Sequence, residues 1–224
     1  MRFRGVLTGL GTAMALALSV QASAAQSLAD YDYTNLKFRG LGVEWGYLYP
    51  TRVDPTQSVG VRMDLGYLGP GVRVVPSVTY WSSRFKRSEV AKFENRVADL
   101  VAAQTGERPN VDLGEIDWSD VELALDAHVV WRVPFGILTY AGMGASAHVL
   151  NGKGAAIDGT FVQDLLDVVT AGFDVHGGLE YPVSDRVRFY GQARYDVLQH
   201  LRYFQLRFGT QFMIGKPAPG EERR

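Results

Sequence analysis

Apolar and polar side chains alternate along eight segments of the chain. In residues 202–215 the large apolar residues Phe204, Leu206, Phe208, Phe212 and Ile214 all fall on alternate positions. The same pattern recurs in residues 41–49, 58–69, 72–81, 120–132, 137–150, 168–181 and 186–197. Successive side chains of a β-strand point to opposite faces of a sheet. The pattern therefore predicts eight strands, each with one apolar and one polar face.

The connections between these segments differ in length from one end of the predicted sheet to the other. Residues 69–71, 133–136 and 183–186 are short and rich in the Gly, Pro, Ser and Asp that tight turns use. Residues 86–117 and 150–167 are long, whereas 50–57 and 198–201 are of modest length. Short turns at one end and longer loops at the other are typical of an up-and-down antiparallel barrel.

Both long loops contain a helical pattern. In residues 88–106, apolar side chains recur at spacings of three and four, with Ser88 predicted as the N-cap and Gly106 as the end. A shorter helix is predicted within residues 158–169, with Phe161, Leu165 and Leu166 on its apolar side.

The composition of the two faces favours a membrane barrel over a water-soluble one. The apolar face is rich in Val, Leu, Phe and Ala, with aromatic residues near strand ends at Tyr47, Tyr49, Tyr67, Trp131 and Tyr181. Aromatic girdles of this kind flank the lipid-facing band of membrane barrels. The alternatives are a lipocalin-type barrel with its apolar face inward and a soluble sandwich, for which the strands are long.

The polar face carries acidic residues and Arg in equal numbers, which predicts a narrow lumen in which buried charges are paired. Arg is favoured over Lys in such pairs because its planar guanidinium binds carboxylates in a fixed geometry. The predicted lumen network comprises Glu44, Arg62, Asp64, Arg73, Glu122, Asp126, His128, Arg132, Asp174, His176, Glu180, Arg186, Arg188, Arg194, Asp196 and Arg207.

The N-terminus has the pattern of a secretory signal peptide. Arg2 and Arg4 precede an uncharged apolar run, and small residues follow, so we expect cleavage near Ala24 or Ala25. Removing residues 1–24 leaves 21 Lys and Arg against 24 Asp and Glu, which disfavours a nucleic-acid partner. The chain contains no Cys, which excludes a disulfide framework. The expected organisation is a signal peptide (1–24), a barrel domain (25–215) and a periplasmic tail (216–224).

Taken together, these features resemble the small outer-membrane β-barrel proteins of the eight-stranded OmpA/OmpX type. The last strand strengthens the resemblance, because residues 207–214 match the family's assembly signal through Arg207, Gly209, Phe212 and Ile214. One departure is that ten residues follow this strand, where many family members end on an aromatic residue. The resemblance implies an all-β transmembrane barrel in the outer membrane, with lipids and the barrel assembly machinery as partners and the long loops available to an extracellular partner.

The sequence offers few candidates for catalysis. Asp126 with His128 and Asp174 with His176 form two Asp-x-His pairs, and counting from the turns places both pairs near the short-turn end. Ser146 and His148 fall nearer the long loops, without an evident carboxylate partner. Because the three His are expected not to converge, we predict no catalytic residue, no metal ligand and no cofactor. The predicted role is structural or interaction-mediating, with a narrow porin-like channel and a lipid-modifying enzyme as alternatives.

Overall fold

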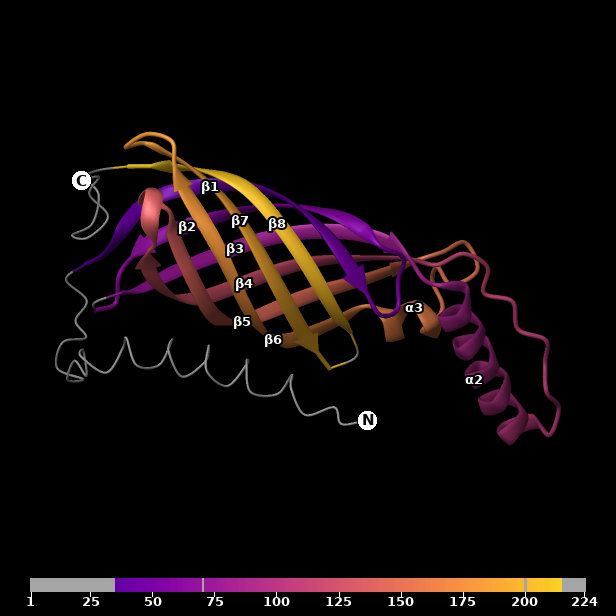
Figure 1. The fold of residues 1–224 in the computed structure, drawn as a ribbon. Helices are drawn as coiled ribbons and strands as arrows, with labels where there is room; N and C mark the ends of the chain where they lie inside the picture. Colours follow the sequence, from indigo (N-terminus) through magenta and orange to yellow (C-terminus); the bar gives the residue numbers. More distant parts are fainter. Residues whose placement is uncertain (1–34, 70, 200, 215–224) are drawn as a thin grey trace, which may run out of the picture.

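The computed structural model describes residues 35–69, 71–199 and 201–214. It consists of a closed antiparallel barrel in which eight strands pair in sequence order (Figure 1). The strands are β1 Leu36–Pro50, β2 Thr56–Gly66, β3 Val72–Arg84, β4 Asp117–Arg132, β5 Leu138–Lys153, β6 Val168–Pro182, β7 Val187–Leu198 and β8 Arg202–Met213. The barrel closes between β1 and β8, which pair from Gly40 opposite Met213 to Pro50 opposite Tyr203. The predicted fold class is confirmed; the predicted signal peptide and tail lie outside the described residues.

The two ends of the barrel differ as the connection lengths predict. Turns β2–β3, β4–β5 and β6–β7 lie at one end, called here the short-turn end, and the other connections lie at the opposite, long-loop end. A short 3-10 helix, η2 (Pro134–Gly136), forms the β4–β5 turn. The helices α2 (Arg87–Thr105) and α3 (Phe161–Leu166) both lie at the long-loop end (Figure 1).

The outward face of the barrel is apolar, because the alternation places the large apolar residues there. Val59, Leu123 and Phe208 are each exposed over more than half of their surface. The predicted girdle residues Tyr49, Trp131 and Tyr181 also point outward, and their exposed fractions are 50%, 42% and 54%. This face therefore presents apolar surface on a scale that isolated surface residues of a soluble protein do not reach.

One residue of the predicted aromatic girdle, Tyr67, does not point outward. Gly66 ends β2 with φ of +78°, a left-handed conformation that reverses the alternation of side chains. The Tyr67 side chain consequently turns inward and is buried, and the Arg39 guanidinium lies 5.6 Å from the centre of its ring. Its assignment to the outward face was wrong.

The helices are close to those predicted, with different starts. Helix α2 ends as expected at Gly106, which has φ of +81°. It begins one residue before Ser88, with Lys86 at the N-cap and no side-chain cap, so the prediction of Ser88 as the cap was wrong. Helix α3 is shorter than predicted, and the Thr160 hydroxyl caps it by accepting from the Val162 amide. No helix among the described residues has the length and hydropathy needed to cross a membrane.

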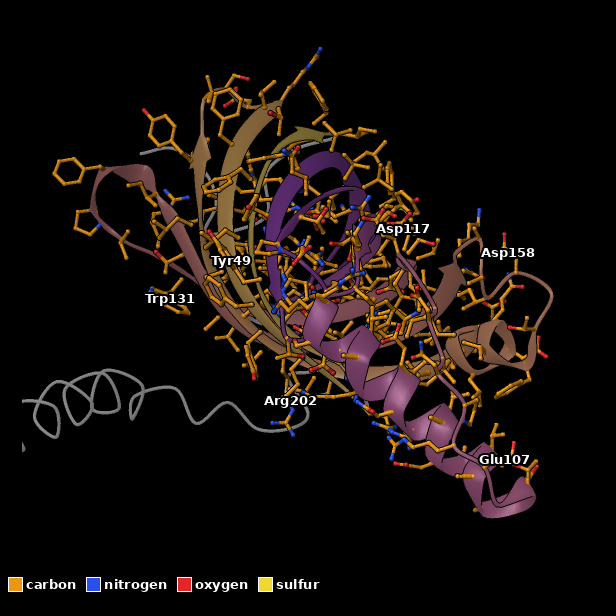
Figure 2. The ribbon with its side chains drawn as sticks, turned by 90° about the vertical axis from the view of Figure 1, so that its right-hand side faces the viewer. Tyr49, Glu107, Asp117, Trp131, Asp158 and Arg202 are labelled. Atoms are coloured by element: carbon orange, nitrogen blue, oxygen red, sulfur yellow. The ribbon has the colours of Figure 1, made fainter. Side chains whose placement is uncertain are left out.

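Two apolar clusters lie at the long-loop end. The first closes the barrel mouth from inside and consists of Leu48, Val53, Trp81, Trp118, Leu150, Leu198, Leu201 and Tyr203. The second joins the two helices to the loop before β4 and consists of Val90, Val97, Leu113, Ile116, Ile157 and Val162. These are called the mouth layer and the helix cluster below. Figure 2 places Glu107 at the end of α2 that is farther from the barrel.

Candidate functional site: the lumen of the barrel

The structure buries nearly all the charged residues that the sequence assigns to the lumen. Arg132 and Arg186 are the exceptions, because both are exposed at the short-turn end, where β4 stops and where the β6–β7 turn ends. Their assignment to the lumen was wrong, since alternation no longer fixes the direction of a side chain at the end of a strand. The buried members are Glu44, Arg62, Asp64, Arg73, Glu122, Asp126, His128, Asp174, His176, Glu180, Arg188, Arg194, Asp196 and Arg207.

The layer of the lumen nearest the short-turn end is organised around Glu180 on β6. Arg73 binds both of its carboxylate oxygens, at 2.8 and 2.6 Å, and Arg62 binds Oε1 at 2.8 Å. Arg188 approaches the same carboxylate to 3.6 Å. Asp64 lies 3.7 Å from Arg73 and accepts a hydrogen bond from a glutamine side chain of β8. This charge-assisted network connects strands on opposite sides of the barrel and fills its cross-section.

The middle layer is organised around Arg194 on β7. Its guanidinium contacts four carboxylates at 2.7 to 2.9 Å, those of Glu122, Asp126, Asp174 and Asp196. Glu122 uses its second oxygen to bind Arg207 at 2.7 Å. Arg207 in turn donates to Glu44 on β1 at 3.1 Å. These bonds therefore connect β4, β6, β7, β8 and β1 through the centre of the lumen.

Several lumen residues were not singled out from the sequence. Tyr190 is buried and donates to Glu44 Oε2 at 2.9 Å, while the Arg62 guanidinium lies 3.3 Å from the centre of its ring. Gln205 accepts from Arg207 at 2.8 Å. Tyr140 donates to another lumen glutamine, Gln192, at 3.1 Å. The alternation of their strands already pointed these side chains inward, so the signal was present but was read only for charged residues.

The two Asp-x-His pairs meet across β5, as the sequence placed them at similar heights. The rings of His128 on β4 and His176 on β6 lie 4.8 Å apart, centre to centre. His176 Nδ1 donates to Asp174 at 2.6 Å. Asp126, His128 and His176 each direct one possible ligand atom to a common region, with these atoms within 4.8 Å of one another. As expected, the three His do not converge, because His148 contacts Asp120 elsewhere. The convergence of Asp126 with His128 and His176 was not predicted.

A second polar group lies one layer closer to the mouth. The Ser146 hydroxyl lies 2.8 Å from His148 Nε2, and His148 Nδ1 lies 2.7 Å from Asp120. Asp120 on β4 is the carboxylate partner that the sequence did not reveal, because its strand is offset from β5 and the residue faces Leu150 in the register. Asp, His and Ser thus follow the hydrogen-bond order of a nucleophilic triad. Gly172 leaves room beside this group, since a Cβ there would come within 2.5 Å of the Ser146 hydroxyl.

The mouth layer covers this group on the long-loop side. Trp118 lies two residues from Asp120 on β4, and Leu150 lies two residues from His148 on β5, both on the long-loop side. Both are 4% exposed. Above the layer, the helices and the barrel mouth enclose an apolar pocket of about 350 Å³. Glu89 on α2 lies at the edge of this pocket, where a hydrogen bond from Lys92 lowers the pKa of its carboxyl group. The mouth-layer residues Trp118 and Leu150 line this pocket, which extends on β6 to Thr170, the register partner of His148.

The predicted assembly-signal residues lie on β8 or just after it. Phe212 and Ile214 point outward, whereas Arg207 belongs to the middle layer of the lumen. Gly209 faces the lumen, where a Cβ would come within 2.4 Å of the Tyr190 ring. The structure thus gives Gly209 a packing role, and the assembly role stays a prediction.

Comparison with known proteins identifies the architecture. The Neisserial surface protein A (NspA) has a similar structure, with a TM-score of 0.50 and 14% identity, over 79% of this chain and 97% of that one. The chain has the fold of the small outer-membrane β-barrels. Lower scores are found for Ail of Yersinia pestis (0.48, 10% identity, 80% and 99% coverage) and the N-terminal barrel domain of OprF from Pseudomonas aeruginosa (0.48, 11%, 78% and 97%). No protein family model and no curated protein sequence matches the chain.

Proposed function

We propose that the protein is an integral outer-membrane barrel with a closed, charge-filled lumen, which presents its helices outside the cell. The apolar outward face is suited to lipid on all sides of the barrel. The short-turn end would face the periplasm, as it does in barrels of this fold. Outer-membrane lipids and, during insertion, the barrel assembly machinery are its proposed partners.

The observation that carries this proposal is the filling of the lumen by bonded charges. An eight-stranded barrel leaves an interior just wide enough for side chains. Here the Glu180 layer and the Arg194 layer connect strands across the interior, and the mouth layer adds an apolar seal. Breaking such buried pairs to open a path would leave uncompensated charge in a low-dielectric interior. A structural or interaction role is therefore favoured over a porin-like channel.

An extracellular partner would meet the segments 86–117 and 150–167. Helix α2 extends from the barrel mouth, and the helix cluster joins it to the loop that carries α3 (Figure 2). Leu100, Phe161 and Leu165 are each 57% exposed on this end. These apolar side chains give the loop end a surface suited to contact with another molecule.

Planar-bilayer recording of the refolded protein tests the closed lumen. We expect no steady conductance steps at moderate voltage, under conditions in which a general-diffusion porin gives steps in the same bilayer. Reproducible single-channel steps from the wild-type protein would contradict the proposal and favour the porin-like alternative.

The hydrogen-bond order of Ser146, His148 and Asp120 favours a second candidate function, ester hydrolysis or acyl transfer with Ser146 as the nucleophile. One feature places it below the first: Ser146 and His148 are both buried. A fluorophosphonate probe separates the two functions. The enzyme requires labelling of the wild-type protein that is absent from Ser146→Ala, and a change in lipid A mass upon expression. The closed structural barrel predicts neither.

A further inference from the structure

Three buried polar atoms in the lumen have no hydrogen-bond partner and face one region. They are Asp126 Oδ1, His128 Nε2 and His176 Nε2. Possible ligand atoms of these three residues lie within 4.8 Å of one another. Buried polar atoms are almost always satisfied by protein, water or an ion, so three such atoms in one place are suited to a shared partner.

We propose that Asp126, His128 and His176 form a binding site for a first-row divalent transition metal ion, of which Zn²⁺ is the test case. Imidazole and carboxylate are ligands that Zn²⁺ takes at about 2.0 to 2.2 Å. In the tetrahedral geometry that Zn²⁺ prefers, ligand atoms at that distance lie about 3.4 Å apart. Because the present separations are up to 4.8 Å, the three side chains would need to close by about 1 Å around the ion. This site is independent of the proposed function, since a closed structural barrel does not require it.

The strand between the two pairs is built to leave room for the ligand atoms. Gly142 and Gly144 on β5 face the lumen between β4 and β6. A Cβ at Gly142 would come within 2.5 Å of His176 Nε2, and one at Gly144 within 2.1 Å of Asp126 Oδ1. Asp126 Oδ1 is the atom nearest to the added Cβ at Gly144, and at Gly142 His176 Nε2 comes second to the backbone oxygen of Ala127, at 2.2 Å. Two Asp-x-His pairs flank a Gly-x-Gly segment, so the cavity results from the sequence of three neighbouring strands.

A hydrogen bond to Asp174 orients the His176 ring as a metal ligand. Its Nδ1 donates to Asp174 at 2.6 Å, which leaves the lone pair of Nε2 directed at the site. A carboxylate that accepts from the distal nitrogen is the usual support of a metal-bound histidine, because it fixes the tautomer and raises the basicity of the ligand. Asp126 is similarly held, since Arg194 binds its Oδ2 at 2.7 Å and leaves Oδ1 free.

His128 requires a change of tautomer. Arg73 Nη2 lies 3.2 Å from its Nδ1, so in the metal-free protein Nδ1 accepts this bond and a neutral ring carries its proton on Nε2. Binding of the ion at Nε2 would move that proton to Nδ1. Arg73 can give up its hydrogen bond to His128 Nδ1, because both terminal nitrogens of Arg73 already donate to Glu180, at 2.8 and 2.6 Å. His176 and Asp126 are therefore the preformed ligands, and His128 completes the site.

The charge of the lumen also favours a cation. Among the described residues, buried Asp and Glu number eight and buried Arg number six, with no buried Lys. The excess of negative charge is concentrated around Arg194, a single cation that contacts four carboxylates. A divalent ion beside Asp126 would offset this excess of negative charge. Arg73 and Arg194 oppose the ion, and they do so from nitrogens that are already bonded to carboxylates.

The test uses the refolded full-length protein in detergent, stripped with EDTA and dialysed against Zn²⁺, with the bound metal measured by mass spectrometry. We expect about one equivalent in the wild type, and at least a tenfold loss of affinity in His176→Gln and in Asp126→Asn. His128→Gln should lose affinity as well. The matched control is His148→Gln, which removes a buried lumen histidine that also contacts an Asp but lies in the Ser146 group; it should bind as the wild type does.

Two further readouts keep the proposal open to refutation if one variant fails to fold. Folding of each variant is checked first by the mobility shift between unheated and boiled samples. Co²⁺ should then give the wild type visible ligand-field bands that His176→Gln lacks. Zn²⁺ should raise the unfolding temperature, whereas Mg²⁺, which prefers oxygen ligands, should not. No uptake by the wild type, or equal uptake by the wild type and His176→Gln, would overturn the proposal and leave a buried water bridging the three atoms.

Discussion

Arg194 contacts more carboxylates than any other described Arg in the lumen. Its three nitrogens contact Glu122, Asp126, Asp174 and Asp196, and its side chain is fully buried. We expect Arg194→Met to lower the free energy of unfolding by about 3–5 kcal/mol, because it leaves four buried acids without their cation. Urea unfolding of the refolded barrel, followed by tryptophan fluorescence, measures the change.

Arg186→Met is the matched control for Arg194→Met, because Arg186 is exposed in the β6–β7 turn. Its effect should stay within about 0.5 kcal/mol, as is usual for surface substitutions. Equal effects of the two substitutions would show that the buried network does not stabilise the barrel.

Gly209 gives a second prediction for a single residue. A Cβ there would come within 2.4 Å of both the Tyr190 ring and the backbone oxygen of Val43. Gly209→Ala should therefore destabilise the refolded barrel by about 1–3 kcal/mol through overpacking. Gly191→Ala is the control, since the nearest atoms to its added Cβ belong to the Phe208 ring at 3.4 Å.

The same pair of variants separates packing from assembly. If Gly209→Ala unfolds like the wild type in vitro but accumulates poorly in the membrane of cells, then the packing explanation is wrong. The glycine would in that case act through the assembly signal.

Among the elements, α2 and α3 form a unit distinct from the barrel wall. Ile157 is fully buried in the helix cluster, where its neighbours come from the two helices and from the loop before β4. Ile157→Ala should cost about 2–5 kcal/mol of local stability by leaving a cavity. Because the cluster includes no side chain of the lumen layers, we expect faster proteolysis of the loops, with the mobility shift of the barrel unchanged.

Leu165→Ala is the control for the helix unit, since Leu165 is 57% exposed on α3. It should leave the rate of loop proteolysis close to that of the wild type. A loss of the barrel's mobility shift in Ile157→Ala would show instead that the loops and the wall unfold together.

The strands could be predicted from sequence because apolar and polar residues alternate with a period of two over ten or more residues in each strand. That signal also identifies the inward face, and hence most of the buried charges. It fails where the backbone departs from extended geometry or where strands end, as at Tyr67 after Gly66 and at Arg132 and Arg186. Side-chain direction at those places depends on local torsion angles, which a hydropathy pattern does not encode.

The polar groups of the lumen were harder to predict, because their geometry depends on register. Asp120 reaches His148 from a strand position that faces Leu150, so counting residues from the turns does not bring the two together. The same counting placed His128 and His176 at similar heights near the short-turn end, but it did not predict that Asp126 lies together with both rings. The decisive feature is the room left by Gly142 and Gly144, which becomes visible only with the neighbouring strands in place.

At the scale of the whole molecule, the four Trp residues report which face of the barrel meets lipid. Trp45 and Trp131 point outward, with exposed fractions of 45% and 42%. Trp81 and Trp118 lie in the mouth layer, with exposed fractions of 1% and 4%. Variants that keep a single Trp, with Phe at the other three positions, isolate each reporter.

In vesicles of lipids brominated along the acyl chain, we expect strong fluorescence quenching of the Trp45 and Trp131 variants and little quenching of the Trp81 and Trp118 variants. Bromine quenches only at short range, so a reporter inside the lumen is shielded by the barrel wall. Quenching should also depend on the position of the bromine for Trp131, which lies on the girdle near the short-turn end of β4. A barrel with its apolar face inward, or a soluble sandwich, would leave all four variants unquenched.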